Sequence, residues 1–233
     1  MALILALETS TSCGSVALLQ DDKLIGYQYY NIDKSHSSLL HPMIDQLMKN
    51  CQFKLSELDA VAISEGPGSY TGLRIGTSAA KGLCFSLDIP LISINTLEAM
   101  AHQVKSMGNT FDLYCPMIDA RRMEVYTLLL DTTSTIRLPT EPMILDESSF
   151  EKELEANKIA FFGDGAFKFK DIVDSSNAVF IDKVTPSAAE IAFLATRKYQ
   201  EALFENVVSF EPFYLKEFRI IPSKKNYAGG NKK

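Results

Sequence analysis

The glycine-rich segment EGPGS at residues 65–69 has the composition of an anion-binding loop. Free backbone N–H groups and the helix dipole at the start of a following helix can hold a phosphate. The segment contains neither G-x-x-x-x-G-K-[ST] nor G-x-G-x-x-G, the two glycine patterns that bind nucleotide phosphates. The residue types therefore favour a structural turn at 65–69 over a phosphate site.

The histidines and cysteines are poorly placed to hold a metal ion. His36 and His41 are five residues apart around Pro42, which makes a poor chelate, and His102 is distant from both in sequence. The four cysteines form no C-x-x-C pair, so neither a zinc site nor a disulfide framework is indicated; they are Cys13, Cys51, Cys84 and Cys115. No Ser-His-Asp or Cys-His arrangement is evident. We expect no metal, no cofactor and reduced thiols.

Composition and charge exclude several classes of protein. With 46% hydrophobic residues in 233, the chain has the composition of a globular protein with a core. Its net charge of -6 argues against a stand-alone nucleic-acid binder. Basic residues gather at 219–233, which leaves 18 basic against 29 acidic residues elsewhere. We expect this tail to be a disordered, solvated end, with a weak phosphate contact as the alternative.

Targeting and membrane segments are not indicated. The start, MALILALETS, has no basic region and its apolar run breaks at Glu8, so it predicts a strand and not a signal peptide. No apolar run reaches the roughly 20 residues that a membrane helix needs. We expect a cytoplasmic protein.

The order of apolar segments divides the chain into two similar α/β halves. Hydrophobic periodicity predicts strands at 3–7, 15–19 and 24–30, a helix at 36–49, a buried strand at 58–64 and a second helix from about 70. The second half restarts with a strand, an acidic turn and another strand. Its first strand ends in Asp119, just as the first strand of the chain ends in Glu8. A helix at 186–199 follows. We expect subdomains at 1–108 and 109–218, each a mixed sheet flanked by helices, before the tail.

The second helix has an unusually smooth side. The helical register places small residues there, namely Gly72, Gly76, Ala79, Ala80 and Leu83. A glycine inside a helix costs about 1 kcal/mol relative to alanine, so the glycines need a reason beyond helix propensity. Close approach of another backbone is such a reason. The spacing does not distinguish packing on the chain's own sheet from contact with another subunit.

Five motifs in order resemble the bacterial TsaB (YeaZ-type) family, over essentially residues 2–216: ALETSTSCGSVALL, SEGPGSYTGLRIG, INTLEAMA, MIDARRMEVY and PFYLKE. The resemblance implies an actin-like, ribonuclease-H-like (ASKHA) fold. It also implies a role in the complex that forms N6-threonylcarbamoyladenosine at position 37 of tRNAs reading codons that begin with A. In that family the chain is a non-catalytic partner of its paralogue TsaD, which transfers the threonylcarbamoyl group, together with the ATPase TsaE.

The same resemblance has two implications for ligand binding. The paralogue holds a metal with two histidines of an N-H-x-E-x-H segment, where this chain has Thr96 and Met100, so no metal site and no catalytic residue are expected. Actin-like ATPases carry an aspartate at the first turn, where this chain has a glutamate. A vestigial nucleotide site would comprise Glu8, Ser10, Asp119, Gly163 and Gly165. Turn residues in a fold that has lost its ligand are the favoured interpretation.

The resemblance also selects a partner-binding face. We expect TsaD to bind the paired helices at 39–48 and 72–87, and the chain alone to form a homodimer there. The expected contact residues are Leu39, Met43, Leu47, Gly72, Leu73, Gly76, Ala79, Ala80 and Leu83. Contact with tRNA is expected only through the complex. The alternative function is an independent enzyme of the superfamily, either metallopeptidase-like or an ATP-dependent kinase.

Overall fold

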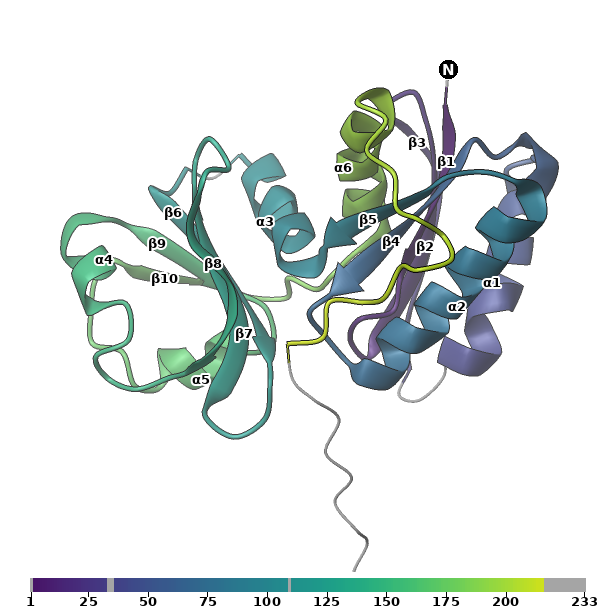
Figure 1. Cartoon of the computed structure of the whole chain (residues 1–233). Helices are drawn as coiled ribbons and strands as arrows, with labels where there is room; N and C mark the ends of the chain where they lie inside the picture. The colour runs from purple at the N-terminus through teal and green to yellow at the C-terminus, as the bar shows by residue number, and fades with distance from the viewer. Residues whose placement is uncertain (1, 33–35, 109, 216–233) are drawn as a thin grey trace, which may run out of the picture.

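The computed structural model describes residues 2–32, 36–108 and 110–215, which form two five-stranded sheets with helices around them (Figure 1). The first sheet contains β1 (Leu3–Glu8), β2 (Cys13–Gln20), β3 (Lys23–Asn31), β4 (Ala60–Gly66) and β5 (Leu91–Asn95). The second contains β6 (Leu113–Asp119), β7 (Glu124–Asp131), β8 (Ile136–Ile144), β9 (Ile159–Phe162) and β10 (Ala178–Ile181). The α-helices are α1 (His36–Asn50), α2 (Tyr70–Leu87), α3 (Thr96–Ser106), α4 (Glu151–Ala156), α5 (Ala166–Lys170) and α6 (Ala188–Gln200), and one 3₁₀ turn covers Leu55–Glu57.

The two sheets have the same topology. Their strand orders are β3-β2-β1-β4-β5 and β8-β7-β6-β9-β10. In each sheet, the first three strands of that half of the chain form an antiparallel meander. The fourth strand pairs in parallel with the first strand of the meander, and the fifth pairs in parallel with the fourth. This repeat confirms the expectation of two similar mixed-sheet halves.

The first strand, β1, lies at the centre of the first sheet and is covered on both faces. Leu3, Leu5 and Leu7 pack in the cluster beneath α1 and α2. Ile4 and Ala6 point to the other face and pack against α6. A strand buried on both faces needs a continuous apolar run rather than an alternating one, which explains the sequence LILALE.

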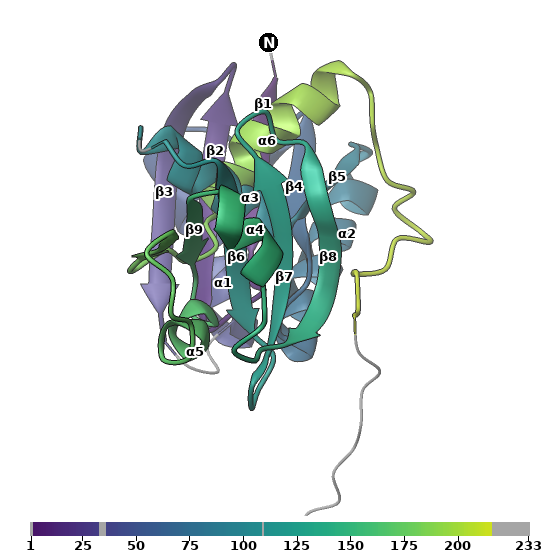
Figure 2. The same cartoon turned by 90° about the vertical axis from the view of Figure 1, so that its left-hand side faces the viewer.

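Helices α3 and α6 lie between the two sheets, and each packs on the sheet of the other half (Figures 1 and 2). Helix α3 contributes Leu97 and Met100 to the core of the second sheet, whereas α6 contributes Ile191 and Ala195 to that of the first. The expected boundary that assigns all of 109–218 to the second subdomain is therefore wrong for α6. A helix buries its apolar face by packing on a sheet face that is otherwise uncovered, and sequence periodicity does not predict which sheet that will be.

After α6, residues 203–214 run along the first sheet without regular structure, and we call them the C-terminal strap. The backbone N–H of Glu205 donates to the carbonyl of Leu91 at 2.8 Å, and that of Phe213 donates to the carbonyl of Glu65 at 2.7 Å. Phe210 is buried in the core beneath α1 and α2. The expected basic tail at 219–233 lies outside the described residues. Within those residues, no helix has the length and apolarity to cross a membrane.

Helix α1 contains a proline beyond its first turn. The helix begins at His36, so Pro42 lies in its second turn. Proline has no N–H to donate, and the helix therefore continues without one backbone hydrogen bond. Burial of Leu40, Met43 and Ile44 against the first sheet supports the helix across this position.

Candidate partner-binding groove

Helix α2 is defined at both ends by its sequence. Ser69, at the end of the glycine-rich segment, caps the helix by accepting a hydrogen bond from the N–H of Gly72. Asp88 ends it in a left-handed conformation, with its N–H bonded to the carbonyl of Cys84. The segment 65–69 thus connects β4 to α2 and starts the helix, in line with the structural turn that the sequence favours.

The inner face of α2 packs on the turn between β1 and β2. A Cβ atom at Gly72 would collide with the carbonyl oxygen of Thr9, and one at Gly76 would collide with the Thr9 hydroxyl. That hydroxyl donates a 2.8 Å hydrogen bond to the carbonyl of Gly72. Of the two readings that the spacing left open, packing within the chain is the correct one for these two glycines.

Much of the expected contact face is therefore part of this chain's own core. The following residues expected to contact a partner are buried in the described structure: Met43, Leu47, Gly72, Leu73, Gly76 and Ala80. Their burial within the chain argues against a direct contact with a docked protein, and their assignment to a partner contact stays a prediction. Small and apolar residues at helical spacing also describe a helix that packs tightly on its own sheet, which is the role seen here.

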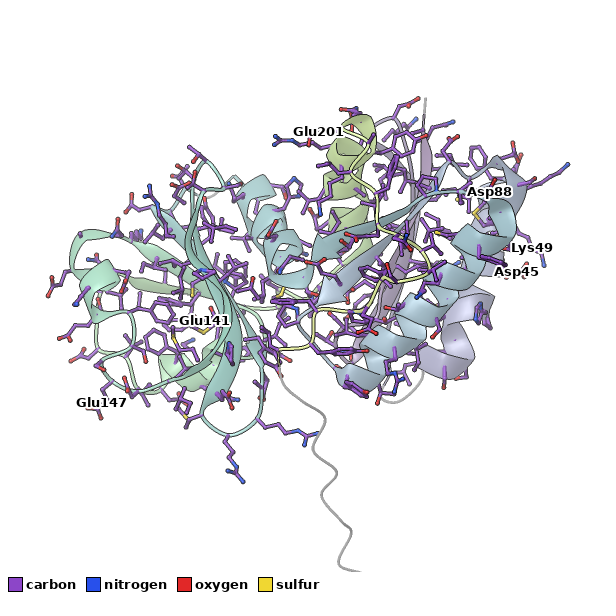
Figure 3. The ribbon with its side chains drawn as sticks, viewed as in Figure 1. Asp45, Lys49, Asp88, Glu141, Glu147 and Glu201 are labelled. Carbon is purple, nitrogen blue, oxygen red and sulfur yellow. The ribbon has the colours of Figure 1, made fainter. Side chains whose placement is uncertain are left out.

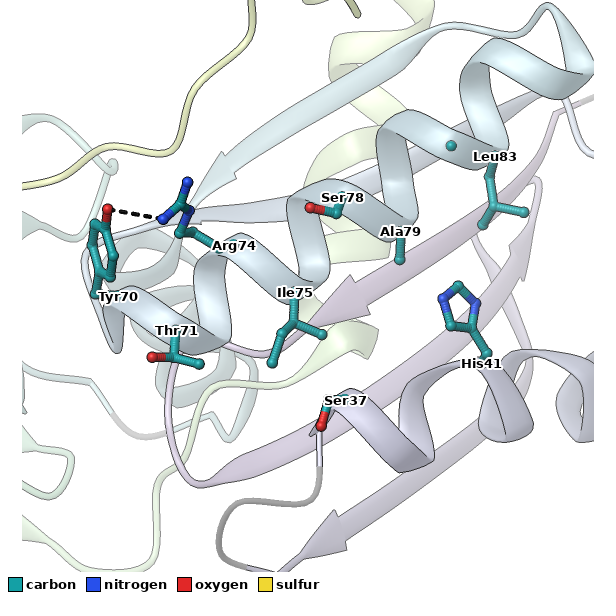
Figure 4. Close-up of a pocket in the computed structure, with 10 residues that line it drawn as sticks. Ser37, His41, Tyr70, Thr71, Arg74, Ile75, Ser78, Ala79 and Leu83 are labelled. Atoms are coloured by element: carbon teal, nitrogen blue, oxygen red, sulfur yellow. Dashed lines mark hydrogen bonds between the residues drawn. The ribbon is translucent and has the colours of Figure 1, made fainter.

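The outer sides of α1 and α2 enclose an open groove of about 690 Å³. Figure 4 shows His41 of α1 pointing toward α2, and Ile75 and Leu83 of α2 pointing toward α1. The full lining is Ser37, His41, Tyr70, Thr71, Arg74, Ile75, Ser78, Ala79, Gly82 and Leu83. Of the expected contact residues, Ala79 and Leu83 line this groove, and Leu39 is half-buried nearby on α1.

Gly82 differs from the other two glycines of α2. It is exposed, it lines the groove, and a Cβ atom added to it would meet nothing within 4 Å. Nothing in this chain requires a glycine there, although alanine would favour the helix by about 1 kcal/mol. Neither Gly82 nor Ile75 was among the expected contact residues. Their positions, about two turns apart on the side of α2 away from Gly76 and Ala80, were the available signal.

One end of the groove is polar, with Arg74 positioned by Tyr70. The Arg74 guanidinium donates to the Tyr70 hydroxyl at 3.2 Å and lies 5.2 Å from the centre of that ring. The Tyr70 ring contacts Tyr214 of the C-terminal strap at a centroid distance of 4.9 Å. Burial raises the pKa of Tyr214, which therefore stays neutral at physiological pH. The groove thus combines an apolar floor with a fixed cation at one end.

The expected vestigial nucleotide residues fall into two separate groups. In the first, Glu8 is fully buried, and its Oε1 accepts a 2.5 Å hydrogen bond from the N–H of Ser10. Burial raises the pKa of Glu8, and the nearby polar groups of Ser10 and Ser64 oppose the rise only in part. The carboxyl group thus makes a hydrogen bond within its own turn through Oε1, whereas Oε2 is buried with no hydrogen-bond partner among the described residues. This turn supplies the packing surface for α2.

The second group surrounds Asp119 at the end of β6. Asp119 Oδ1 accepts hydrogen bonds from Lys168 Nζ at 2.6 Å and from the N–H of Arg121 at 2.5 Å. Burial would raise the pKa of Asp119, but these partners hold it below its usual value. The carboxylate is thus charged and engaged by this chain's own groups.

The glycines of the second group are explained by packing. Gly163 has a φ of 99°, and a Cβ atom there would collide with the carbonyl oxygen of Met117. A Cβ atom at Gly165 would lie 2.8 Å from Val125 Cγ1. Both glycines allow the turn after β9 to lie against β6, so no ligand is needed to account for them. A nucleotide site at these residues stays a prediction.

The residues in place of the paralogue's metal ligands have structural roles. Thr96 and Met100 are both buried in α3. The three histidines lie apart: His36 Nε2 contacts the carbonyl of Thr11 at 2.6 Å, His41 lines the groove, and His102 Nδ1 pairs with Glu190 of α6 at 2.5 Å. Across residues 2–32, 36–108 and 110–215, no three His, Cys, Asp or Glu side chains are grouped to hold a metal ion.

Comparison with known proteins places this geometry in a family. The family model described as TsaD, tRNA N6-adenosine threonylcarbamoyltransferase, matches residues 30–227. The tRNA threonylcarbamoyladenosine biosynthesis protein TsaB of Bacillus subtilis is 33% identical over 205 residues, covering 84% of this chain and 87% of the relative.

Solved structures agree. An uncharacterised Pseudomonas aeruginosa protein, described as similar to peptidase YeaZ, has a TM-score of 0.82 at 26% identity, covering 93% of this chain and 100% of that one. The ADPNP-bound activator of a Clostridium difficile 2-hydroxyisocaproyl-CoA dehydratase has a TM-score of 0.51 at 10% identity, covering 88% of this chain and 98% of that one, which speaks for the fold alone. These likenesses confirm the expected actin-like (ASKHA) fold class. The chain belongs to the TsaB (YeaZ-type) family.

Proposed function

We propose that this chain is a non-catalytic scaffold subunit required for forming N6-threonylcarbamoyladenosine at position 37 of tRNAs that read codons beginning with A. In this proposal it binds the catalytic paralogue TsaD through the groove between α1 and α2, and works in the cytoplasm in a complex that includes TsaE. The name of its Bacillus subtilis relative, a threonylcarbamoyladenosine biosynthesis protein, supports the pathway.

The groove is the observation that supports a scaffold role. Ile75 and Leu83 keep part of their apolar surface exposed to it, beside the exposed and sterically free Gly82. An apolar depression with a small residue at its edge suits a helix from another protein, because the two backbones can approach closely there. The lining residues described above provide no nucleophile paired with a base, so binding is favoured over catalysis for this surface.

Family membership supports the choice of occupant that we propose. A family model of the transferase matches most of this chain, so the proposed partner shares its fold and has a counterpart of α1 and α2. Two related helix pairs can pack face to face in a near-symmetric arrangement, as in an isologous dimer. We therefore propose TsaD as the occupant, and a second copy of this chain as its weaker competitor.

Reconstitution tests the function. Purified chain, TsaD and TsaE are combined with the enzyme that makes the carbamoyl-adenylate, and tRNA modification is measured with each component omitted in turn. We expect modification to require this chain and the chain alone to transfer nothing. Transfer by this chain without TsaD would support the independent-enzyme alternative and contradict the scaffold role.

Charge substitutions test the groove. Ile75→Glu and Leu83→Glu place an unpaired carboxylate in the proposed contact, which costs several kcal/mol, or about a hundredfold or more in affinity. Ile144→Glu is the matched control, because Ile144 is 72% exposed on β8 and lies outside the groove. Calorimetric titration with TsaD should show the loss for the groove variants alone. Parent-like binding by both groove variants would place the contact elsewhere.

A further inference from the structure

The turn between β6 and β7 presents two adjacent arginines in an unfavourable backbone conformation. Arg121 has a φ of 73° and Arg122 a φ of 53°, both in the left-handed region that glycine, asparagine and aspartate tolerate best. Within the described residues, the other adjacent pair with positive φ is Asp21–Asp22 in the β2–β3 turn. Aspartate suits such a turn, whereas arginine gains nothing from it locally.

The turn is held in place by its surroundings. The N–H of Arg121 donates to Asp119, the N–H of Ala120 donates to the carbonyl of Glu124 at 3.0 Å, and the N–H of Leu145 donates to the carbonyl of Met123 at 2.7 Å. Because several hydrogen bonds fix the backbone, the two side chains leave from a preorganised base. Figures 1 and 2 show this turn projecting at the lower end of the second sheet.

The two guanidinium groups are available for a partner. Both side chains are exposed, and neither forms an ion pair within the described part of the chain. Asp119 forms its ion pair with Lys168 at 2.6 Å, and the charge of Arg121 only adds to the effects that keep the pKa of Asp119 low.

Strained residues that carry unpaired charge at a fixed position often mark a functional contact. We propose that Arg121 and Arg122 contact the phosphate backbone of the tRNA that the complex modifies. Arginine offers planar, bidentate donors that match phosphate oxygens, which is a reason to keep it at a turn where its backbone is disfavoured. This inference rests on the proposed function, because it takes the RNA partner from there.

The test uses the full complex with TsaD and TsaE and measures its affinity for an unmodified tRNA over a salt series. The variant Arg121→Asn/Arg122→Gly suits the left-handed turn, so the chain should melt at the same or a higher temperature and bind TsaD normally. Its complex should bind tRNA several-fold more weakly, with a salt slope reduced by about one unit for each lost phosphate contact. Arg121→Lys/Arg122→Lys should recover most of the affinity.

Two controls separate this effect from others. Asp21→Asn/Asp22→Gly makes the same backbone change in the β2–β3 turn, and Lys23→Gln/Lys152→Gln removes two exposed positive charges elsewhere. Both should leave the salt slope unchanged. An unchanged slope for the arginine variant, an equal fall in the lysine control, or a loss of TsaD binding by the arginine variant would each overturn the proposal. Failure of the parent complex to modify tRNA would instead count against the proposed function.

Discussion

The inner and outer faces of α2 both carry glycine, for opposite reasons. On the inner face, Gly72 and Gly76 leave room for Thr9, whose hydroxyl donates to the carbonyl of Gly72. On the outer face, Gly82 borders the groove and has no neighbour that a Cβ atom would meet. A helix glycine therefore points to a partner only when the chain itself leaves its missing side chain unexplained.

The largest expected effect is at the inner face. Gly76→Arg should unfold the protein or reduce its stability by more than about 3 kcal/mol, because even a Cβ atom there collides with Thr9. Ser78→Arg is the control, since Ser78 is exposed on the same helix. Circular dichroism during thermal unfolding measures both. A folded Gly76→Arg protein with the parent's melting temperature would show that the two faces of α2 have been assigned the wrong way round.

This contrast also shows how far the sequence alone could lead. The strand meander, the restart before Asp119 and the helix expected at 186–199 followed from apolar periodicity and capping residues, which are local signals. The direction in which α2 presents its glycines depends on the β1–β2 turn, whose Thr9 is 63 residues before Gly72. Likewise, the placement of α6 on the first sheet is a tertiary choice that no local pattern encodes.

The turn beneath the inner face gives a pH-dependent prediction. Because burial raises the pKa of Glu8, the folded state holds its proton more tightly than the unfolded state does. Stability should therefore fall as pH rises from the ordinary glutamate value of 4.5 to the higher pKa of the folded protein, and then level off with respect to this group. Glu8→Gln keeps the acceptor for Ser10 and removes the titration.

Melting temperatures of both proteins between pH 4 and 9 test this. At low pH they should agree closely, whereas above the window Glu8→Gln should be more stable by roughly 1–3 kcal/mol, the cost of an unsatisfied buried group. Parallel pH profiles for the two proteins would contradict the assignment. A loss of stability in Glu8→Gln at high pH would mean that the charged carboxylate supports the turn.

A smaller effect is expected where α2 meets the C-terminal strap. Lys81 Nζ donates to the carbonyl oxygens of Val208 at 2.9 Å and Phe210 at 3.1 Å. Lys81→Met keeps the apolar stem and should cost about 1 kcal/mol by losing these bonds at a partly exposed site. Lys49→Met is the control, because its exposed pair with Asp45 (Figure 3) should contribute under about 0.5 kcal/mol. Equal losses in urea denaturation would show that the strap does not depend on Lys81.

Gly82→Ala tests the scaffold proposal most directly, because it separates the stability of the chain from its binding. With no neighbour within 4 Å of the new methyl group, the helix should gain up to about 1 kcal/mol, which raises the melting temperature by about 2–4 °C. If a helix of TsaD approaches here, the same methyl group should weaken calorimetric binding of TsaD about tenfold, and Gly82→Leu should weaken it further. A stabilised Gly82→Leu protein that binds TsaD as tightly as the parent would contradict the groove as the docking site.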